Sequence, residues 1–402
     1  MTPPAAGQAS EATETSTGTA KVAMDPAFAG FVAQMREAAL ASGVSARIFD
    51  RAFAGLEPDP EILALLDRQP EHDSGIWDYI DRMVSEERIA LGQAALIANR
   101  GLLDAIEGFY GVDRHVVVAI WGMESKYGGN AGSRNVVRSL ATLAYAGGRR
   151  TDYGRTQLLA ALRILEKGDI APERMLGSWA GAMGHTQFIP TTFEAYAVDF
   201  DRDGHRDIWS NVGDALASTA SYLARSGWRS GETWGYEVTL PAGFDYALAG
   251  TREAKPIRSF MKLGVRRVAA QDFPDPDRPS TLLLPAGARG PAFLVSTNFR
   301  AILRYNNAVA YGLAVGHLAD RLAGRGPIVQ QWPRDERPLS RDEREELQRL
   351  LSASGYELGE PDGLIGSATK AALRAYQRAR GLPPDGFPTI GLLERLRAEA
   401  RT

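Results

Sequence analysis

The segment from Asp113 to Gly128 carries the side chain best suited to chemistry, the glutamate at position 124. Asp113 is typical of a helix cap, and Val117, Ile120 and Glu124 follow at the spacing that puts residues on one helix face. The carboxyl group is therefore expected on an apolar side. Apolar surroundings disfavour a charged carboxylate, so its pKa should rise toward neutrality, as a general acid requires. The alternative is a glutamate in the last turn that reaches solvent past Gly128, as most glutamates do.

A second group of chemically capable residues begins at Asp199. Asp199, Asp201, Asp203 and Asp207 match the oxygen-ligand positions in the front half of a calcium loop, and Gly204 matches its sharp turn. Carboxylate oxygens are the ligands that Ca²⁺ prefers in proteins. The spacing therefore predicts a cation loop.

The back half of this loop departs from the pattern. Ser210 stands where a bidentate glutamate usually completes the coordination of Ca²⁺, and Asp214 replaces it only if the loop is longer. The predicted ligand set is Asp199, Asp201, Asp203, His205 and Asp214. An ion held there would be structural. The alternative is a carboxylate-rich turn that binds Na⁺ weakly or binds nothing.

Composition sets limits on the rest of the chain. The 402 residues include 46 Lys and Arg against 49 Asp and Glu, and this near-neutral balance argues against a dedicated nucleic-acid binder. With 44% hydrophobic and 24% charged residues, the chain is typical of a soluble globular protein of two or three domains. The absence of cysteine excludes disulfides, thiolate metal sites and a cysteine nucleophile.

The elements that must position these groups are mostly helical. Residues 2–21 lack large apolar side chains, so residues 1–24 are predicted to form a flexible tail. Residues 25–323 predict a mainly helical catalytic region, interrupted at about 234–296 by short alternating runs typical of a strand-containing insertion. Residues 324–340, rich in proline and charge, predict a linker.

The last segment, residues 341–402, contains an internal near-repeat. Asp362-Gly363 and Asp385-Gly386 each predict a turn that leads into a helix. With a preceding apolar stretch, this pattern predicts a small three-helix domain. It holds no combination of residues that resembles a catalytic site.

Two sequence blocks resemble a known family. They are Glu124-Ser125-Lys126-Tyr127-Gly128 and the stretch from Gly177 to Pro190 with Ala-Gly-Ala-Met-Gly-His-Thr-Gln-Phe-Ile-Pro at its end. Both resemble the lysozyme-like lytic murein transglycosylases, specifically the membrane-bound lytic transglycosylase B family, over roughly residues 25–325. The C-terminal repeat separately resembles a peptidoglycan-binding module. The resemblance implies a lysozyme-like, mainly α (α+β) catalytic domain and a small three-helix C-terminal domain.

The resemblance also implies a reaction. The enzyme would cleave the β-1,4 bond between N-acetylmuramic acid and N-acetylglucosamine and leave a 1,6-anhydromuramic acid end. Glu124 would protonate the leaving oxygen and then accept the proton of the substrate's own C6 hydroxyl. A lysozyme-type hydrolase is one alternative, with Asp152 or Glu194 as a second acid. A non-catalytic scaffold that binds murein is the other.

The family's cleft residues map onto particular positions of this chain. Ser178 and Gln187 would line the cleft near the acid, Tyr305 and Asn306 would face it, and Tyr311 would lie further along the sugar groove, with Tyr222 and Tyr79 as further cleft aromatics and Arg149 and Arg150 placed for murein carboxylates. The alternatives are structural. Gln187 would then bond backbone, Tyr222 and Tyr311 would be core residues, and the arginines would be a solvated pair.

The expected location follows from the substrate. Peptidoglycan lies in the periplasm or cell envelope, but no signal peptide is recognisable in this chain. The reaction as implied needs no cofactor, and a structural Ca²⁺ is the one expected ion. The C-terminal module would hold the enzyme on the glycan and raise the effective substrate concentration. A helical domain that binds a protein partner is its alternative.

Overall fold

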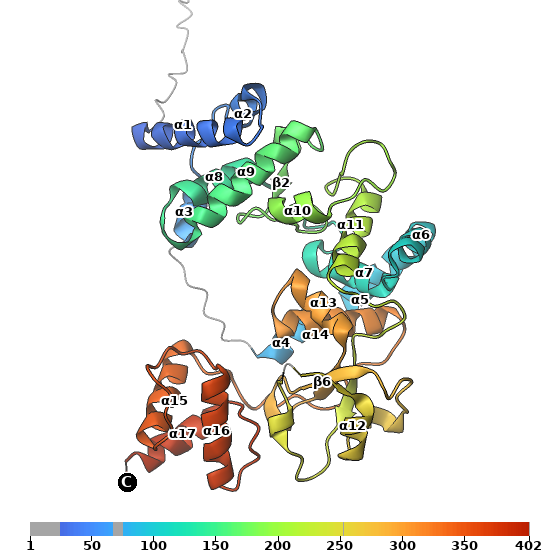
Figure 1. Ribbon diagram of the computed structural model, residues 1–402, viewed down its shortest axis with the longest axis vertical. Coiled ribbons are helices and arrows are strands. Elements are labelled where there is room, and N and C mark those ends of the chain that lie inside the picture. Colours follow the sequence, from blue (N-terminus) through green and yellow to red (C-terminus); the bar gives the residue numbers. More distant parts are fainter. Residues whose placement is uncertain (1–24, 67–74, 252, 402) are drawn as a thin grey trace, which may run out of the picture.

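The computed structural model describes residues 25–66, 75–251 and 253–401. The predicted tail, residues 1–24, lies outside the described residues. The fold is mainly α, as predicted (Figure 1). The buried apolar side chains of the described residues form four clusters. Each cluster is built by a different set of elements.

The first cluster joins helices from the beginning and the middle of the catalytic region. These are α1 (Pro26–Ala41), α2 (Ala46–Ala52), α3 (Pro60–Leu66), α8 (Val136–Tyr145), α9 (Thr151–Lys167) and α10 (Pro190–Tyr196). In α1, Phe28, Phe31 and Met35 recur at helical spacing and are all buried. Burial of this stripe holds α1 against the α8–α9 pair, which lies beside it in Figure 1.

The second cluster surrounds the helix that carries Glu124. It is formed by α4 (Ile76–Met83), α5 (Glu86–Ala98), α6 (Arg100–Tyr110), α7 (Arg114–Ser125), α11 (Val212–Arg225), α13 (Thr297–Tyr305) and α14 (Val309–Leu322). Every residue of α7 from Val116 to Gly122 is buried, so this helix lies at the centre of the lobe. Among the described residues no single helix is long and apolar enough to cross a membrane, although the bent pair α5 and α6 passes that test jointly.

A five-stranded antiparallel sheet separates α11 from α13 in the sequence. Its strands are β3 (Gly235–Thr239), β4 (Lys255–Pro256), β5 (Arg266–Arg267), β6 (Pro279–Leu283) and β7 (Ala292–Val295), in the spatial order β4-β6-β7-β3-β5. Helix α12 (Ile257–Lys262) packs with the sheet around a cluster of its own. A separate two-stranded pair, β1 (Arg134–Asn135) and β2 (Leu176–Gly177), lies next to the helices of the first cluster.

The C-terminal helices α15 (Arg341–Ala353), α16 (Ser367–Ala379) and α17 (Ile390–Glu399) enclose the fourth cluster. The near-repeat of the sequence corresponds to two equivalent sets of hydrogen bonds in the structure. The Gln348 amide donates to the Asp362 carboxylate at 2.9 Å, and the Gln377 amide donates to the Asp385 carboxylate at 2.7 Å. Each glutamine therefore secures one Asp-Gly turn to a helix.

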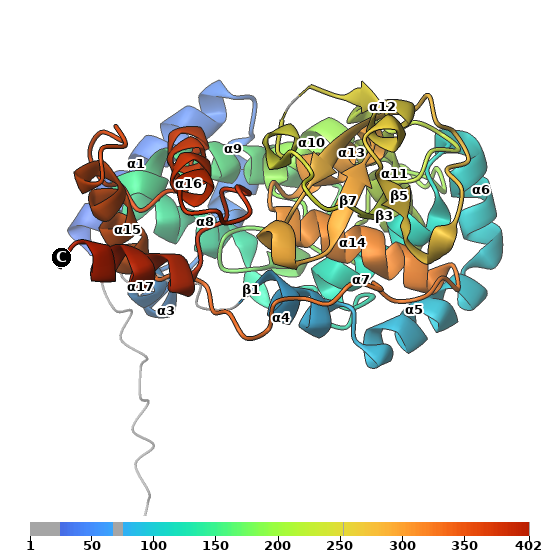
Figure 2. The ribbon, with the colours of Figure 1, turned by 90° about the horizontal axis from the view of Figure 1, so that it is seen from below.

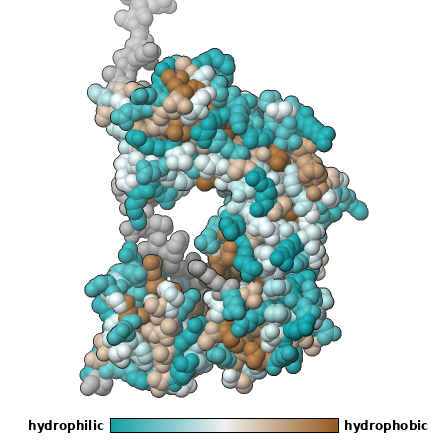
Figure 3. Space-filling model, viewed as in Figure 1, coloured by the Kyte–Doolittle hydropathy of each residue, from teal (hydrophilic) through white to brown (hydrophobic). Residues whose placement is uncertain are grey.

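One of the two turns also joins this module to the strand insertion. The second oxygen of Asp385 accepts the backbone N–H of Ala288 at 2.7 Å, and Arg374 donates to the carbonyl of Ala249 at 3.2 Å. The connecting chain runs past α4 (Figure 2), where Arg334 pairs with Asp81 at 2.7 Å. Figure 3 shows the surface hollowed by an opening between the α8–α9 side and the module.

Replacement of Asp385 by alanine should release the module from the insertion. The variant loses the bond to Ala288, and we expect docking to weaken by about 1–2 kcal/mol. Limited proteolysis within residues 324–340 should then be several-fold faster than in the wild type.

Asp362→Ala is the matched control, because it removes the equivalent bond to Gln348, and among the described residues the Asp362 carboxylate forms hydrogen bonds only within the module. Equal cleavage of the two variants would contradict a docking role for Asp385.

Candidate active site

Glu124 lies in the last turn of α7, where the helix ends abruptly. Lys126 and Tyr127 both adopt the left-handed conformation, with φ of 49° and 59°, and Gly128 follows with φ of 90°. Non-glycine residues seldom adopt positive φ, and such strain is concentrated at functional sites. The helix therefore ends one residue after the glutamate and leaves its side chain at the helix terminus.

The carboxyl group borders a cavity of about 540 Å³. The cavity is lined by Arg82, Met83, Ser85, Glu87, Arg88, Leu91, Met123, Glu124, Lys126, Tyr127 and Asn130. Burial raises the pKa of Glu124 to about 7, while a hydrogen bond from Tyr311 opposes the rise. The side chain is only partly exposed. At neutral pH the carboxyl is thus poised between its two protonation states, which suits a group that gives and takes a proton.

Tyr311 is the direct partner of Glu124. Its hydroxyl donates to Glu124 Oε1 at 2.6 Å from the first turn of α14, and its ring is buried. The expected position of Tyr311 further along a sugar groove differs from this placement, because α14 packs directly against α7. Burial and the charge of Glu124 raise the pKa of both Tyr305 and Tyr79, so these two rings also lie close to the acid.

Tyr305 belongs to a group of aromatic rings with Tyr222 and Phe188. The Tyr222 and Tyr305 rings are 4.9 Å apart, and Phe188 lies 5.7 Å from Tyr305. The hydroxyl of Tyr305 donates to the carbonyl of Thr186 at 2.7 Å, and that of Tyr222 donates to the carbonyl of Arg304. The Tyr305 bond attaches α13 to the loop that precedes α10, and the Tyr222 bond joins α11 to α13.

Ser178 and Gln187 shape that loop through backbone contacts. The Ser178 hydroxyl accepts the N–H of Ala182 at 3.0 Å. The Gln187 amide donates to the carbonyls of Gly184 and Ala131 at 2.9 Å and 3.0 Å, the second of which lies in the turn after α7. In this structure Gln187 bonds backbone, the alternative that its sequence position left open.

Three of the expected cleft residues point toward solvent. Arg149 and Arg150 are exposed in a short 3-10 turn before α9, where Arg150 stacks on the Trp179 ring at 4.9 Å. Asn306 is exposed at the end of α13. No direct contact with Glu124 is recorded for any of the three.

Other carboxyl groups differ in their relation to the cavity. Glu194 is held by Arg163 in an ion pair of 2.6 Å, and Asp152 is exposed in the first turn of α9, away from the cavity lining. Glu87, which the sequence did not single out, is exposed in the first turn of α5 and shares the cavity with Glu124. Of these three carboxyl groups, Glu87 is therefore the one placed to act beside Glu124.

The acidic loop brings together three of its five predicted ligands. Oxygens of Asp199, Asp201 and Asp203 all lie within 4.8 Å of one another. Asp214 is buried, and its two oxygens accept the backbone N–H groups of Phe200 and Asp207 at 2.7 Å and 2.8 Å. Asp214 therefore differs from its expected role as a ligand: it lies outside the ligand cluster and holds the backbone of the loop.

His205 also stands apart from this cluster. It is exposed, and its backbone N–H donates to Asp203 at 2.8 Å. The cluster of ligand atoms that the described residues form does not include it.

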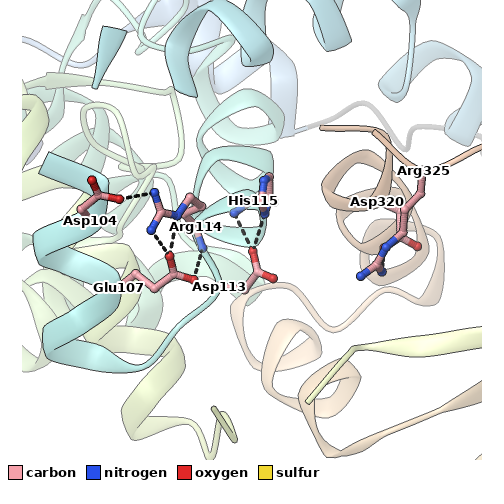
Figure 4. Close-up of polar contacts among 7 residues, drawn as sticks. All are labelled: Asp104, Glu107, Asp113, Arg114, His115, Asp320 and Arg325. Atoms are coloured by element: carbon pink, nitrogen blue, oxygen red, sulfur yellow. Dashed lines mark hydrogen bonds and ion pairs between the residues drawn. The ribbon is translucent and has the colours of Figure 1, made fainter. Parts of the chain in front are cut away.

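A larger cavity of about 890 Å³ lies at the opposite end of α7. Its lining includes Glu107, Asp113 and His115. Figure 4 shows the polar contacts of these residues: Arg114 bridges Asp104 and Glu107, and Asp113 pairs with His115 at 2.9 Å. Asp320 is likewise bound by Arg325 and by the Trp234 indole. These carboxylates are paired with arginine or histidine side chains, whereas among the described residues the partner of Glu124 is the neutral Tyr311 hydroxyl, so we place the chemistry at Glu124.

Two contributors near the site had no role in the sequence prediction. Tyr127 lines the cavity and donates its hydroxyl to the carbonyl of Arg88 at 2.8 Å. His185 accepts a hydrogen bond from the Trp121 indole at 2.9 Å. The apolar spacing of α7 includes Trp121, but no local pattern pairs it with a residue in another loop.

Comparison with known proteins shows the family of each part of the chain. The model of the transglycosylase SLT domain matches residues 27–320, and that of a putative peptidoglycan-binding domain matches residues 340–396. SltB3 of Pseudomonas aeruginosa, solved in complex with NAG-anhNAM-pentapeptide, is 52% identical, with a TM-score of 0.89 over 93% of this chain and 100% of that one.

Two Escherichia coli proteins are more distant. Membrane-bound lytic murein transglycosylase B is 29% identical over 65% of this chain and 74% of its own length. The lytic transglycosylase Slt35, solved in complex with calcium, is 26% identical, with a TM-score of 0.62 over 74% of this chain and 93% of that one.

A lysozyme-like, mainly helical fold with the partly buried Glu124 carboxyl beside a cavity defines a glycan-cleaving enzyme. The chain belongs to the transglycosylase SLT domain family. It is a lytic murein transglycosylase that carries a C-terminal peptidoglycan-binding domain, as the sequence resemblance predicted.

Replacement of Glu124 by glutamine should stabilise the fold at alkaline pH. An unfolded chain releases this proton near pH 4.5, whereas the folded enzyme keeps it to about pH 7. The folded state therefore loses stability as pH rises through this window, by about 2–3 kcal/mol at pH 8. Urea unfolding should show Glu124→Gln more stable than wild type at pH 8 and nearly equal at pH 5. The same difference at both pH values would exclude a raised pKa.

Proposed function

We propose that Glu124 is the one protein group that exchanges protons with the substrate in this lytic transglycosylase. The observation that carries the proposal is its pKa of about 7, set by burial beside the cavity. In the first step the protonated carboxyl gives its proton to the glycosidic oxygen between N-acetylmuramic acid and N-acetylglucosamine. The bond from that oxygen to the anomeric carbon then breaks, and Glu124 becomes a carboxylate.

In the second step the substrate supplies its own nucleophile. The C6 hydroxyl of the muramic acid attacks the anomeric carbon, and the Glu124 carboxylate accepts the hydroxyl proton. A 1,6-anhydro ring forms, the acid is restored, and no water is consumed. Intramolecular delivery makes a second protein carboxylate unnecessary. The hydrogen bond from Tyr311 stabilises the carboxylate between the two steps, because it favours the charged form.

The remaining cleft residues are assigned by their distance from this chemistry. Tyr79 and Tyr305 lie near the acid and offer ring faces to a sugar. Ser178 and Gln187 hold the surrounding loop in place, and Tyr222 joins α11 to α13. We assign the exposed groups Arg149, Arg150 and Asn306 to outer contacts with the carboxylates and amides of murein.

Digestion of purified sacculi tests the assignment of Glu124. Wild type should release muropeptides that are lighter by one water than the products of a hydrolase. Glu124→Gln should lower this release at least a hundredfold, as expected when the acid is removed, and still bind sacculi. Asp152→Asn, an exposed acid outside the cavity, should retain activity.

Glu87→Gln separates the transglycosylase from a hydrolase that uses two carboxylates. If water were activated by Glu87, this variant would lose activity together with Glu124→Gln. Continued release of anhydro products by Glu87→Gln supports the single-acid mechanism. A wild type that binds sacculi and releases nothing would favour the scaffold alternative.

The domain assignment follows from the same proposal. We assign residues 25–323 to the catalytic region, 234–296 to its strand insertion, 324–340 to the linker and 341–402 to the wall-binding module. The separate apolar clusters of the insertion and the module support this division. Since the substrate of the family lies in the cell envelope, we propose a periplasmic location.

We further propose that Asp199, Asp201 and Asp203 hold a structural Ca²⁺. Two of these carboxylates are exposed, and their close approach places like charges together, which a divalent cation would relieve. The ion would fix the loop that begins at Asp199 and take no part in proton transfer. The alternative remains a carboxylate-rich turn secured by Asp214 from inside.

Thermal unfolding tests the calcium proposal without an activity assay. Millimolar Ca²⁺ should raise the Tm of the wild type by several degrees, because a ligand that binds only the folded state stabilises it. EGTA should reverse the shift, and Asp201→Asn should abolish most of it. A Tm that is unchanged by Ca²⁺ in both proteins would leave the loop as a turn without an ion.

A further inference from the structure

The end of α7 is held from one side by a short loop that contains His185. The loop's backbone is folded back on itself, since Met183 N–H donates to the carbonyl of Phe188 at 2.9 Å. His185 N–H donates to the carbonyl of Ile208 at 2.9 Å, which ties the loop to the segment before α11. The loop is therefore fixed by main-chain hydrogen bonds that do not involve α7.

Two side-chain contacts connect this loop to the helix that carries the acid. The Trp121 indole donates to His185 Nδ1 at 2.9 Å, one turn before Glu124. The hydroxyl of Ser125, the residue after Glu124, donates to the carbonyl of His185 at 2.9 Å. The same hydroxyl accepts the backbone N–H of Gly128 at 3.1 Å, so it also holds the left-handed turn that follows the helix.

Gly128 shows how closely the His185 ring approaches the turn. A Cβ at this position would lie 2.3 Å from His185 Cε1, and φ of 90° is unfavourable for other residues. The ring thus fills the space beside the strained turn, between the Trp121 side chain and Gly128. An indole nitrogen can only donate, so His185 Nδ1 must carry no proton when this bond is made.

We propose that His185 is a positioning residue, which through the bond from Trp121 fixes the last turn of α7 and so aims the Glu124 carboxyl at the glycosidic oxygen. This inference rests on the proposed function of Glu124. On the other side, Tyr311 holds the carboxyl itself from α14. Between these two constraints the acid keeps one direction, which matters because proton transfer requires hydrogen-bond distance to the reacting oxygen.

The test compares kcat and KM on soluble, uncrosslinked glycan strands. Trp121→Phe removes the donor, and His185→Leu removes the acceptor. Each should lower kcat by about tenfold or more while KM changes less than twofold, because a small misplacement of a catalytic group affects the rate far more than binding. His185→Asn, whose amide oxygen can take the place of Nδ1, should recover most of kcat.

Trp234→Phe is the control, because it removes a hydrogen bond of another tryptophan indole that does not contact the His185 loop. Its indole donates to Asp320 at 3.1 Å at the end of α14 distant from Tyr311. This variant should lose stability and keep kcat. In the double variant Trp121→Phe with His185→Leu, the loss of kcat should be no greater than in either single variant, since both remove one bond. Fully additive losses, or equal kcat for His185→Asn and His185→Leu, would overturn the proposal.

Nitrogen NMR reads the same bond without substrate. The chain has five histidines, so ¹⁵N-labelled side chains can be resolved and His185 assigned by substitution. Its Nδ1 should give the signal of an unprotonated acceptor in wild type, and Trp121→Phe should shift it. A signal that does not move would exclude the bond, even if Trp121→Phe is too unstable for kinetics. If the wild type itself releases no anhydro products, the proposed function is refuted. The NMR signal of His185 would still show whether the bond from Trp121 exists.

Discussion

The structure depends on one carboxyl group that is held between two opposing influences. Burial beside the cavity favours the protonated form of Glu124, while the hydroxyl of Tyr311 favours the carboxylate. The balance places the pKa at about 7, where the group can donate and accept a proton in turn. The two residues are 187 positions apart, so this balance exists only when α14 packs against α7.

That requirement accounts for the position of α7 at the centre of its lobe. A helix with buried residues on every side tolerates little rotation, because each turn would move apolar side chains out of well-packed positions. Its end is fixed as strictly, since two non-glycine residues in the left-handed region follow the glutamate. The strain of that turn is offset by the contacts of Ser125 and Trp121 with the neighbouring loop.

The C-terminal module shows how a repeat acquires two different roles. Its two Asp-Gly turns are held by equivalent glutamines, so both halves contribute to folding in the same way. Among the residues that the structure describes, only the second turn bonds to the strand insertion, through Asp385 and Ala288. Both turns thus contribute to the stability of the module, and the second contributes to docking as well.

The sequence by itself determined what is local. Helical spacing identified α7 and the face that carries Glu124, the Asp-Gly pairs identified both turns of the module, and the two motif blocks identified the family. These features are set by residues a few positions apart, whose geometry follows from the helix or turn that they form.

Only the tertiary structure decided which distant groups meet. It placed Tyr311 on the acid, took Asp214 out of the ligand cluster, brought Glu87 to the cavity and paired Trp121 with His185. Periodicity gives the face of one helix and does not give the element packed against it. Each of these contacts joins separate elements, or reaches into a cavity between them, so it arises from the packing of the whole chain.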